Sequence, residues 1–225
     1  MAEHRSESME DYLKAIYELT SGGDRASTGA IAGALKVAPA SVTDMLQRLA
    51  ERDPSLVDYR KHQGAALTET GELIALETLR HHRLLEVFLH EVLGYSWDKV
   101  HQEAENLEHV ISDYFEERLT EVLGDPERGI HGEPIPSRDL IMPAHTEIYL
   151  HDMRPPQQGI IQSVRDRDPG FLRYLQEKGL VPGTRFMITD FSPFDHLHYL
   201  IVEGEEDEVV LGEGISAQIF VEIVS

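Results

Sequence analysis

The sequence predicts a mainly α-helical protein that ends in a small all-β part. Apolar residues recur at helical spacing through most of residues 9–123, and a stretch rich in proline and glycine follows over residues 125–159. Five short apolar runs, each typical of a strand, occupy the remainder. At 225 residues with 41% apolar content, the chain is long enough to bury two or three small cores.

The pattern of the first 70 residues indicates a winged helix-turn-helix. A first helix begins near Met9 and is stopped by Gly22-Gly23, and Ser27 can cap the second helix. The expected elements that follow are helices over residues 29–37 and 40–51 and a β-hairpin wing over residues 56–60 and 65–68. This order of elements places one helix in the major groove of DNA and the wing on its backbone.

The exposed face of the helix over residues 40–51 is polar, as a base-reading surface requires. The predicted base contacts are Ser41, Thr43, Asp44 and Gln47, with Pro39 and Ala40 against thymine methyl groups, and the predicted phosphate contacts are Arg48, Arg60 and Lys61. A net charge of −21 argues against binding to random DNA, but residues 36–62 carry five basic and four acidic residues. Recognition of DNA would therefore depend on this short surface alone. The alternative interpretation is that residues 1–70 form a protein-protein interaction module, and that the polar face of the helix is only its solvent-exposed side.

Two longer amphipathic helices are expected over residues 69–93 and 96–123, each followed by a glycine, Gly94 and Gly124. Their apolar content exceeds what one helix pair would bury alone. We therefore expect part of their surface to form a dimer interface.

Acidic residues and histidines gather on these helices with the spacing of one helical face. On the second long helix they are His101, Glu105, Glu108 and His109, on the first they are His82 and Glu86, and on the N-terminal helix Asp11 lies beside the apolar stripe. Carboxylates on one face repel one another, so a divalent cation would stabilise the arrangement. The chain has no cysteine, and this donor set favours Mn²⁺ or Fe²⁺ over Zn²⁺. The alternative is a solvated polar face.

The C-terminal part is expected to form a small β-barrel. Its candidate strands cover residues 160–164, 186–190, 199–202, 209–211 and 219–223, with one helix over residues 169–178. The predicted domains are accordingly 1–70 for DNA binding, 71–143 for metal binding and dimerisation, a linker over 144–158 and a barrel over 159–225.

Several of these stretches resemble the diphtheria-toxin-repressor family of metal-dependent bacterial regulators, over essentially the full length of the chain. They are Glu10–Leu19, the helix-turn-helix through Arg48, His82–Glu86, Lys99–His101, Glu105–His109, Leu175–Leu180 and Pro182-Gly183. The last two, together with Gly159–Ile161 and Asp168-Pro169, resemble the SH3-like barrel that longer members share with iron-transport accessory proteins.

The resemblance implies a homodimeric repressor whose metal-bound form binds a palindromic operator in double-stranded DNA and silences metal uptake. It implies a primary metal site at Asp11, Glu105, Glu108 and His109, and an ancillary site at His82, Glu86 and His101 that barrel residues complete in iron-type members. Iron-type members carry Met and Cys where this chain has Asp11 and Glu105, so the chain is similar to the manganese branch, with iron as the alternative. Members with a two-metal cluster have an acid where this chain has Lys14, so the resemblance does not extend to that cluster.

Other classes of function are less well supported by the sequence. A metal-dependent hydrolase would use a metal-activated water, but no HExxH, GxSxG or Walker motif is present. A metal-buffering accessory protein would leave the helix-turn-helix unexplained. No apolar run approaches the length of a membrane span, and we expect a cytoplasmic, non-enzymatic protein without a membrane partner.

Overall fold

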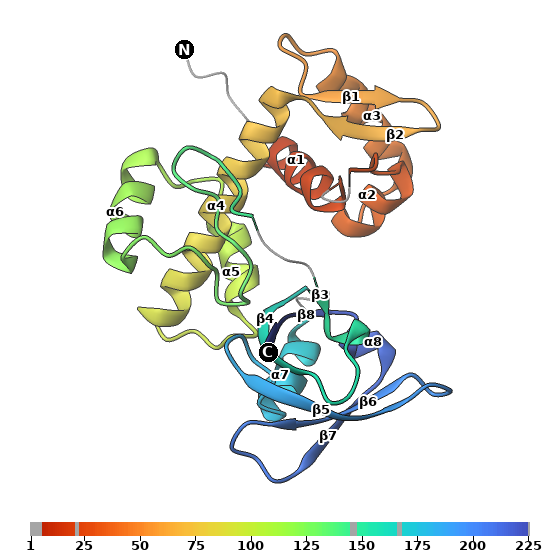
Figure 1. Cartoon of the computed structure of the whole chain (residues 1–225). Helices are drawn as coiled ribbons and strands as arrows, with labels where there is room; N and C mark the ends of the chain where they lie inside the picture. The colour runs from red at the N-terminus through yellow and green to blue at the C-terminus, as the bar shows by residue number, and fades with distance from the viewer. Residues whose placement is uncertain (1–5, 21–22, 145–147, 166–167, 225) are drawn as a thin grey trace. The chain divides into compact units, whose positions relative to one another are not determined.

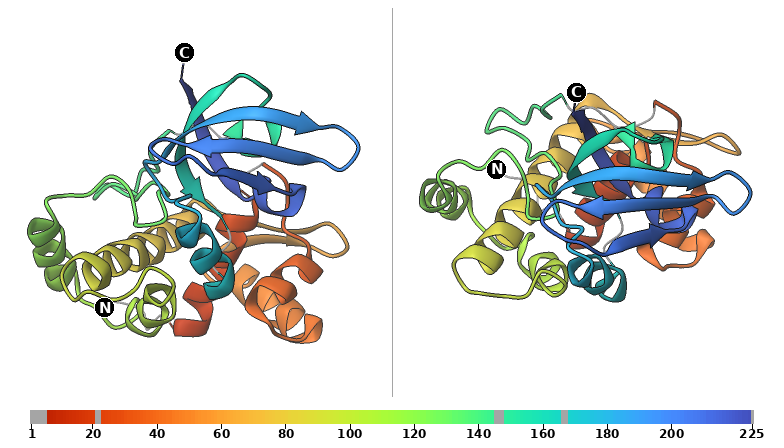
Figure 2. Two further views of the ribbon diagram at one scale, coloured as in Figure 1. Left: turned by 90° about the horizontal axis from the view of Figure 1, so that it is seen from below. Right: turned by 60° about the horizontal axis from the view of Figure 1, so that its bottom comes forward.

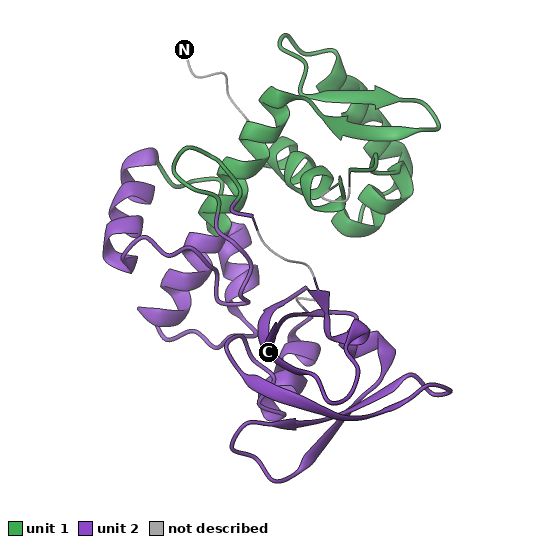
Figure 3. Cartoon of the chain, in the orientation of Figure 1, with its two compact units in different colours: residues 1–82, 107–112, 136–142 green, residues 83–106, 113–135, 143–225 purple. Residues whose placement is uncertain are grey.

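The computed structural model describes residues 6–20, 23–144, 148–165 and 168–224 (Figure 1; Figure 2 gives two further views). They form two compact units, coloured separately in Figure 3. Unit 1 comprises residues 1–82, 107–112 and 136–142, and unit 2 comprises residues 83–106, 113–135 and 143–225. The mainly α-helical fold with an all-β C-terminal part is confirmed. Gly22 and residues 145–147 of the expected linker lie outside the described ranges.

Unit 1 contains the winged helix-turn-helix. Its elements are α1 (Glu7–Thr20), α2 (Thr28–Leu35), α3 (Pro39–Ala50), β1 (Val57–Arg60), β2 (Gly64–Leu67) and the first part of α4 (Glu69–Glu91). The Ser27 side chain accepts a hydrogen bond from the Ala30 amide and so caps α2, while Pro39 supplies the preset backbone angle of the first turn of α3. The antiparallel wing pairs Val57 with Leu67 and Arg60 with Gly64.

One apolar core holds these elements together. Leu13 and Ile16 from α1, Ile31 from α2, and Val42 and Leu46 from α3 are all fully buried in it. The wing is fastened close to its turn, because the amide and carbonyl of Ala26 pair with those of Ala65 in β2. Helix α3, which carries the predicted base contacts, and the β1–β2 wing are therefore parts of one packed body.

Gly64 combines a left-handed backbone with a close approach to the chain at Ala26. Its φ is +93°, and a Cβ built there would lie 2.3 Å from the carbonyl oxygen of Ala26. Replacement of Gly64 by Ala should destabilise unit 1 by more than the about 1 kcal/mol that left-handed backbone strain alone costs, measured by urea unfolding. The matched control is Gly23→Ala, whose φ is +85° but whose Cβ would meet nothing within 4 Å. An equal loss of unfolding free energy in the two variants would contradict the close approach of Gly64 to the Ala26 carbonyl.

The helix expected over residues 96–123 is two helices, so that prediction is wrong. The structure has α5 (Val100–Leu107) and α6 (Asp113–Leu123), separated by a turn in which the Val110 amide bonds to the Leu107 carbonyl. Glu108 and His109 lie in this turn, outside α5, so they do not share a helical face with His101 and Glu105. Contacts of Glu108 and His109 within unit 1 override the helical pattern of the sequence.

Unit 2 combines α5, α6 and the end of α4 with an antiparallel six-stranded sheet. Its strands are β3 (Ile148–Tyr149), β4 (Gln158–Val164), β5 (Arg185–Ser192), β6 (Leu197–Val202), β7 (Glu208–Leu211) and β8 (Ile219–Val224), in the order β3-β8-β4-β5-β6-β7. Beside them lie a 3₁₀ turn (Leu150–Asp152), α7 (Pro169–Glu177) and α8 (Glu213–Ser216). All five expected strands are present; β3 and α8 were not predicted, and the stretch expected to be irregular contributes β3 to the sheet. The β5–β6 hairpin extends beyond its neighbours (Figure 2).

The sheet encloses the core of unit 2. Leu150, Ile161, Leu172, Ile188 and Leu200 are fully or almost fully buried in it. Trp97, the only tryptophan, packs into the same core from the segment before α5. Among the described residues, no helix has the length and apolar character needed to cross a membrane.

Candidate metal centre

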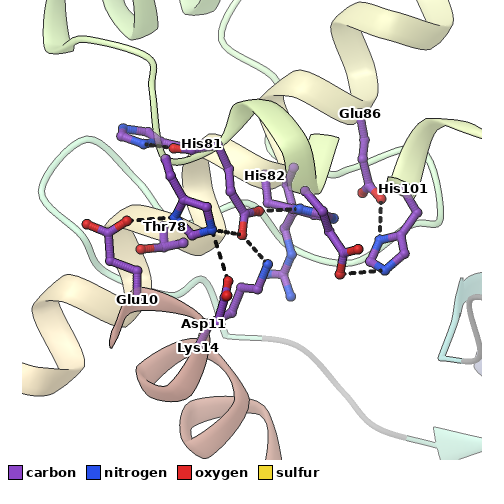
Figure 4. A network of polar contacts seen from close by, with 12 residues as sticks. Glu10, Asp11, Lys14, Thr78, His81, His82, Glu86 and His101 are labelled. Carbon is purple, nitrogen blue, oxygen red and sulfur yellow. Dashed lines mark hydrogen bonds and ion pairs between the residues drawn. The ribbon is translucent and has the colours of Figure 1, made fainter. Parts of the chain in front are cut away.

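Three of the four residues predicted for the primary site meet in unit 1. Asp11 comes from α1, and Glu108 and His109 come from the turn after α5; one ligand atom of each lies within 4.8 Å of the others. His109 Nε2 is 2.9 Å from Asp11 Oδ1 and 3.3 Å from Glu108 Oε1. Figure 4 shows Asp11 directed into this network of contacts. The fourth predicted ligand, Glu105, belongs to unit 2.

Two further residues of α1 take part, and neither was among the predicted ligands. Glu10 Oε2 lies 2.6 Å from His109 Nδ1, and the Lys14 ammonium forms an ion pair with Glu108 Oε1 (Figure 4). Because Glu10 precedes Asp11, both carboxylates can reach one imidazole from opposite ring nitrogens. An adjacent pair of acids was the only sequence signal for Glu10.

Glu108 is a buried carboxylate that remains charged. Burial alone would raise its pKa, but hydrogen bonds and charge from His82 and Lys14 outweigh it and hold the pKa of Glu108 below its ordinary value. The His82 ring, predicted as an ancillary ligand, bonds through Nδ1 to Glu108 Oε2 in unit 1. The Nδ1 of His81 also lies 3.2 Å from the Glu108 carbonyl oxygen.

His109 is surrounded by carboxylates. Burial opposes its charged form, yet the hydrogen bonds to Asp11 and Glu10 and the charge of Glu108 raise the pKa of His109 to about 10. Without a metal the imidazole is therefore protonated at neutral pH. Since a metal binds the neutral ring, an ion that enters here must replace a proton.

A second cluster lies in unit 2 around Glu86, whose side chain is fully buried. Its Oε1 is 3.2 Å from His101 Nδ1, and His101 Nε2 is 3.4 Å from Glu105 Oε1. His131 Nε2 lies 3.9 Å from the same Glu86 oxygen. His82, the remaining predicted ancillary ligand, precedes Glu86 by one helical turn in α4.

The sequence carries no signal for His131, because this residue stands alone in the proline- and glycine-rich stretch, outside any periodic pattern. The structure holds it firmly. Its carbonyl oxygen accepts a hydrogen bond from the Val164 amide of β4, and its ring packs 5.4 Å from the Trp97 ring. At the adjacent Gly132, a Cβ would lie 1.8 Å from the Gln162 carbonyl oxygen, so the backbone itself seats this segment on the sheet.

Both clusters fit a divalent cation. Each brings a fully buried carboxylate together with imidazole nitrogens, and such groups are paired or metal-bound in stable proteins. With no thiolate donor in the chain, the donors suit hard or borderline ions such as Mn²⁺ and Fe²⁺.

The predicted DNA-contacting residues lie on the surface of unit 1. Pro39, Ala40, Ser41, Asp44, Gln47 and Arg48 of α3 and Arg60 and Lys61 of the wing are exposed, and Thr43 is half-buried. The Thr43 hydroxyl donates to the Pro39 carbonyl, so it has no hydrogen left to donate to a base and can contact one only as an acceptor or through its methyl group. Arg25 braces the wing through a 2.9 Å ion pair with Asp58.

Three protein-family profiles match the chain in succession. They are the iron dependent repressor N-terminal DNA binding domain (residues 4–65), the iron dependent repressor metal binding and dimerisation domain (residues 68–137) and the FeoA domain (residues 148–223). Together they follow the same order as the structural parts described above.

Individual relatives agree with the profiles. The chain is 39% identical over 130 residues to the diphtheria toxin repressor of Corynebacterium diphtheriae, covering 58% of this chain and 57% of that protein. It is 30% identical over 210 residues to the iron-dependent repressor IdeR of Mycobacterium leprae, covering 88% and 90%. A solved structure of a manganese-dependent transcriptional repressor in complex with manganese is 34% identical, with a TM-score of 0.87 over 95% of this chain and 98% of that one.

The contacts of His109 should make the stability of the metal-free protein depend on pH. Its pKa rises from 6.5 to about 10 on folding, so the stability it contributes is complete below pH 6.5 and is lost as the pH rises through about 10. Urea unfolding in the presence of a chelator should give a higher free energy of unfolding for wild type than for His109→Gln. This difference should be largest at pH 6 and should shrink by pH 10. A difference that does not change with pH would contradict the ion pairs of His109 with Asp11 and Glu10.

Proposed function

Because the chain belongs to the diphtheria-toxin-repressor family of metal-dependent transcriptional repressors, we propose that it is a Mn²⁺-activated repressor that binds operator DNA as a homodimer. The observation that carries the proposal is the convergence of Asp11, Glu108 and His109 in the unit that also holds the winged helix-turn-helix. A cation at this place acts on the DNA-binding body itself.

The ion would be held by Asp11, Glu108 and His109, the three predicted ligands that meet in unit 1. It supplies positive charge to a cluster of carboxylates. Asp11 lies on α1, which packs on α2 and through it on α3, while Glu108 and His109 lie in the turn after α5. Joining Asp11 to Glu108 would therefore fix the recognition helix relative to the segment over residues 107–112. Metal and DNA would each strengthen binding of the other by the same factor.

The choice of Mn²⁺ rests on the donors. Two carboxylates and one imidazole are oxygen-rich and contain no sulfur, which suits Mn²⁺ better than softer ions. Fe²⁺ is the alternative, and Zn²⁺ ranks below both.

We assign the ancillary site to Glu86 and His101, with His82 one turn earlier on α4 and His131 as an additional ligand. His131 is favoured by its position beside the Glu86 carboxylate. Because β4 holds its backbone, the sheet would help to place this ligand.

The homodimer is favoured by apolar side chains that unit 2 exposes. Tyr114, Phe115 and Val122 on α6 and Val92 and Leu93 after α4 are all more than 40% exposed. Side chains of this kind seldom face water in numbers without a partner. Palindromic DNA would then match the twofold symmetry of the dimer.

Metal-dependent DNA binding is the direct test. Fluorescence anisotropy with a labelled duplex carrying the promoter of its own gene should show tight binding with Mn²⁺ and at least tenfold weaker binding without metal, at one stated salt concentration. Glu108→Gln should abolish the metal response, whereas Glu205→Gln, an exposed residue between β6 and β7, should preserve it. The same measurement is made with Fe²⁺ and Zn²⁺. DNA affinity that does not change with Mn²⁺, Fe²⁺ or Zn²⁺ would refute the proposal, and a response to Fe²⁺ alone would refute the choice of Mn²⁺.

Trp97 offers a separate test of the ancillary site. Its ring packs on His131, so paramagnetic Mn²⁺ bound beside Glu86 should quench its fluorescence. We expect the quenching to persist in Asp11→Asn and to be lost in Glu86→Gln and His131→Gln. Quenching that survives His131→Gln at unchanged Mn²⁺ affinity would remove His131 from the ligand set.

A further inference from the structure

Lys14 places a positive charge on an oxygen atom that the metal would use. It lies on α1, three residues after Asp11, and its ammonium contacts Glu108 Oε1. The same oxygen is 3.3 Å from His109 Nε2. The Lys14 side chain is 12% exposed and that of Glu108 is fully buried, so water screens this ion pair little.

The ammonium group and a metal ion have opposed requirements at this oxygen. A protonated amine offers three donor hydrogens and no lone pair, so it cannot be a ligand. It can only neutralise the carboxylate or repel another cation. Two like charges a few ångströms apart in a partly buried site repel by more than they would in water. Any ion that binds Glu108 must therefore displace Lys14 or bind against its charge.

We propose that Lys14 is a built-in competitor of the metal, a counter-ion that neutralises Glu108 in the metal-free protein and is displaced from it when the ion binds. The proposal rests on the proposed metal site at Asp11, Glu108 and His109. It makes Lys14 a residue that sets the metal concentration at which the protein responds, although Lys14 itself is not a ligand.

A positioning role for Lys14 would have the opposite sign. If the ammonium kept Glu108 turned toward the metal and stayed in place on binding, its removal would weaken the site. Competition predicts instead that removal strengthens metal binding while it weakens the metal-free fold, because Glu108 then loses a partner in a buried place.

The experiment measures Mn²⁺ binding by titration calorimetry in the full chain carrying Glu86→Gln, so that the primary cluster is observed alone. Lys14→Met and Lys14→Gln remove the charge, and Gln retains a hydrogen-bond donor in case Met impairs folding. Lys14→Arg retains the charge, and Lys178→Met removes an equal charge from the exposed end of α7. Thermal unfolding without metal is recorded for each variant.

Lys14→Met and Lys14→Gln should bind Mn²⁺ about tenfold more tightly, and should unfold at a lower temperature than the parent without metal. Lys14→Arg and Lys178→Met should match the parent in affinity. Unchanged or weaker binding in both neutral variants would overturn the competitor role while leaving the metal site intact. Failure of the parent to bind Mn²⁺ at all would instead overturn the proposed function, and the role of Lys14 with it.

Discussion

The buried charge of Glu108 is the constraint on which the candidate centre depends. A carboxylate cannot be taken out of water without compensation, and the chain meets this need with His82 from α4, Lys14 from α1 and the neighbouring His109. These contacts join segments far apart in the sequence into unit 1. They also account for the interruption between α5 and α6, because a continuous helix would carry Glu108 onward along the α5 axis.

The buried charge of Glu108 also explains why the sequence predicted some helices correctly and missed the break between α5 and α6. Periodic apolar residues such as Leu13, Ile16 and Leu46 predicted α1 and α3, and short apolar runs predicted five of the six sheet strands. The spacing of Glu108 and His109 is equally compatible with helix and turn, so only their long-range partners end α5. The two residues of β3 are too few for any pattern to appear.

The candidate ligands divide in the same way. Asp11, Glu86 and His101 could be predicted because they stand at helical spacing from other donors or from an apolar stripe. Glu10 and His131 could not, since each acquires its place from tertiary contacts: Glu10 from the His109 ring, and His131 from the Val164 amide and Trp97. In unit 2 the sheet is therefore more than an appended module, because its backbone helps to position a donor beside Glu86.

The donors in both clusters share one chemical property, which is that none contains sulfur. Thiolates that bind metals are also the side chains that peroxides convert to sulfenic and sulfinic acids, with loss of the ligand. Carboxylates and imidazoles such as those of Glu108 and His109 do not follow this route, and the chain has no cysteine to oxidise. The ligand sets described above would therefore lose no ligand by thiol oxidation, the reaction that inactivates a sensor built on cysteine.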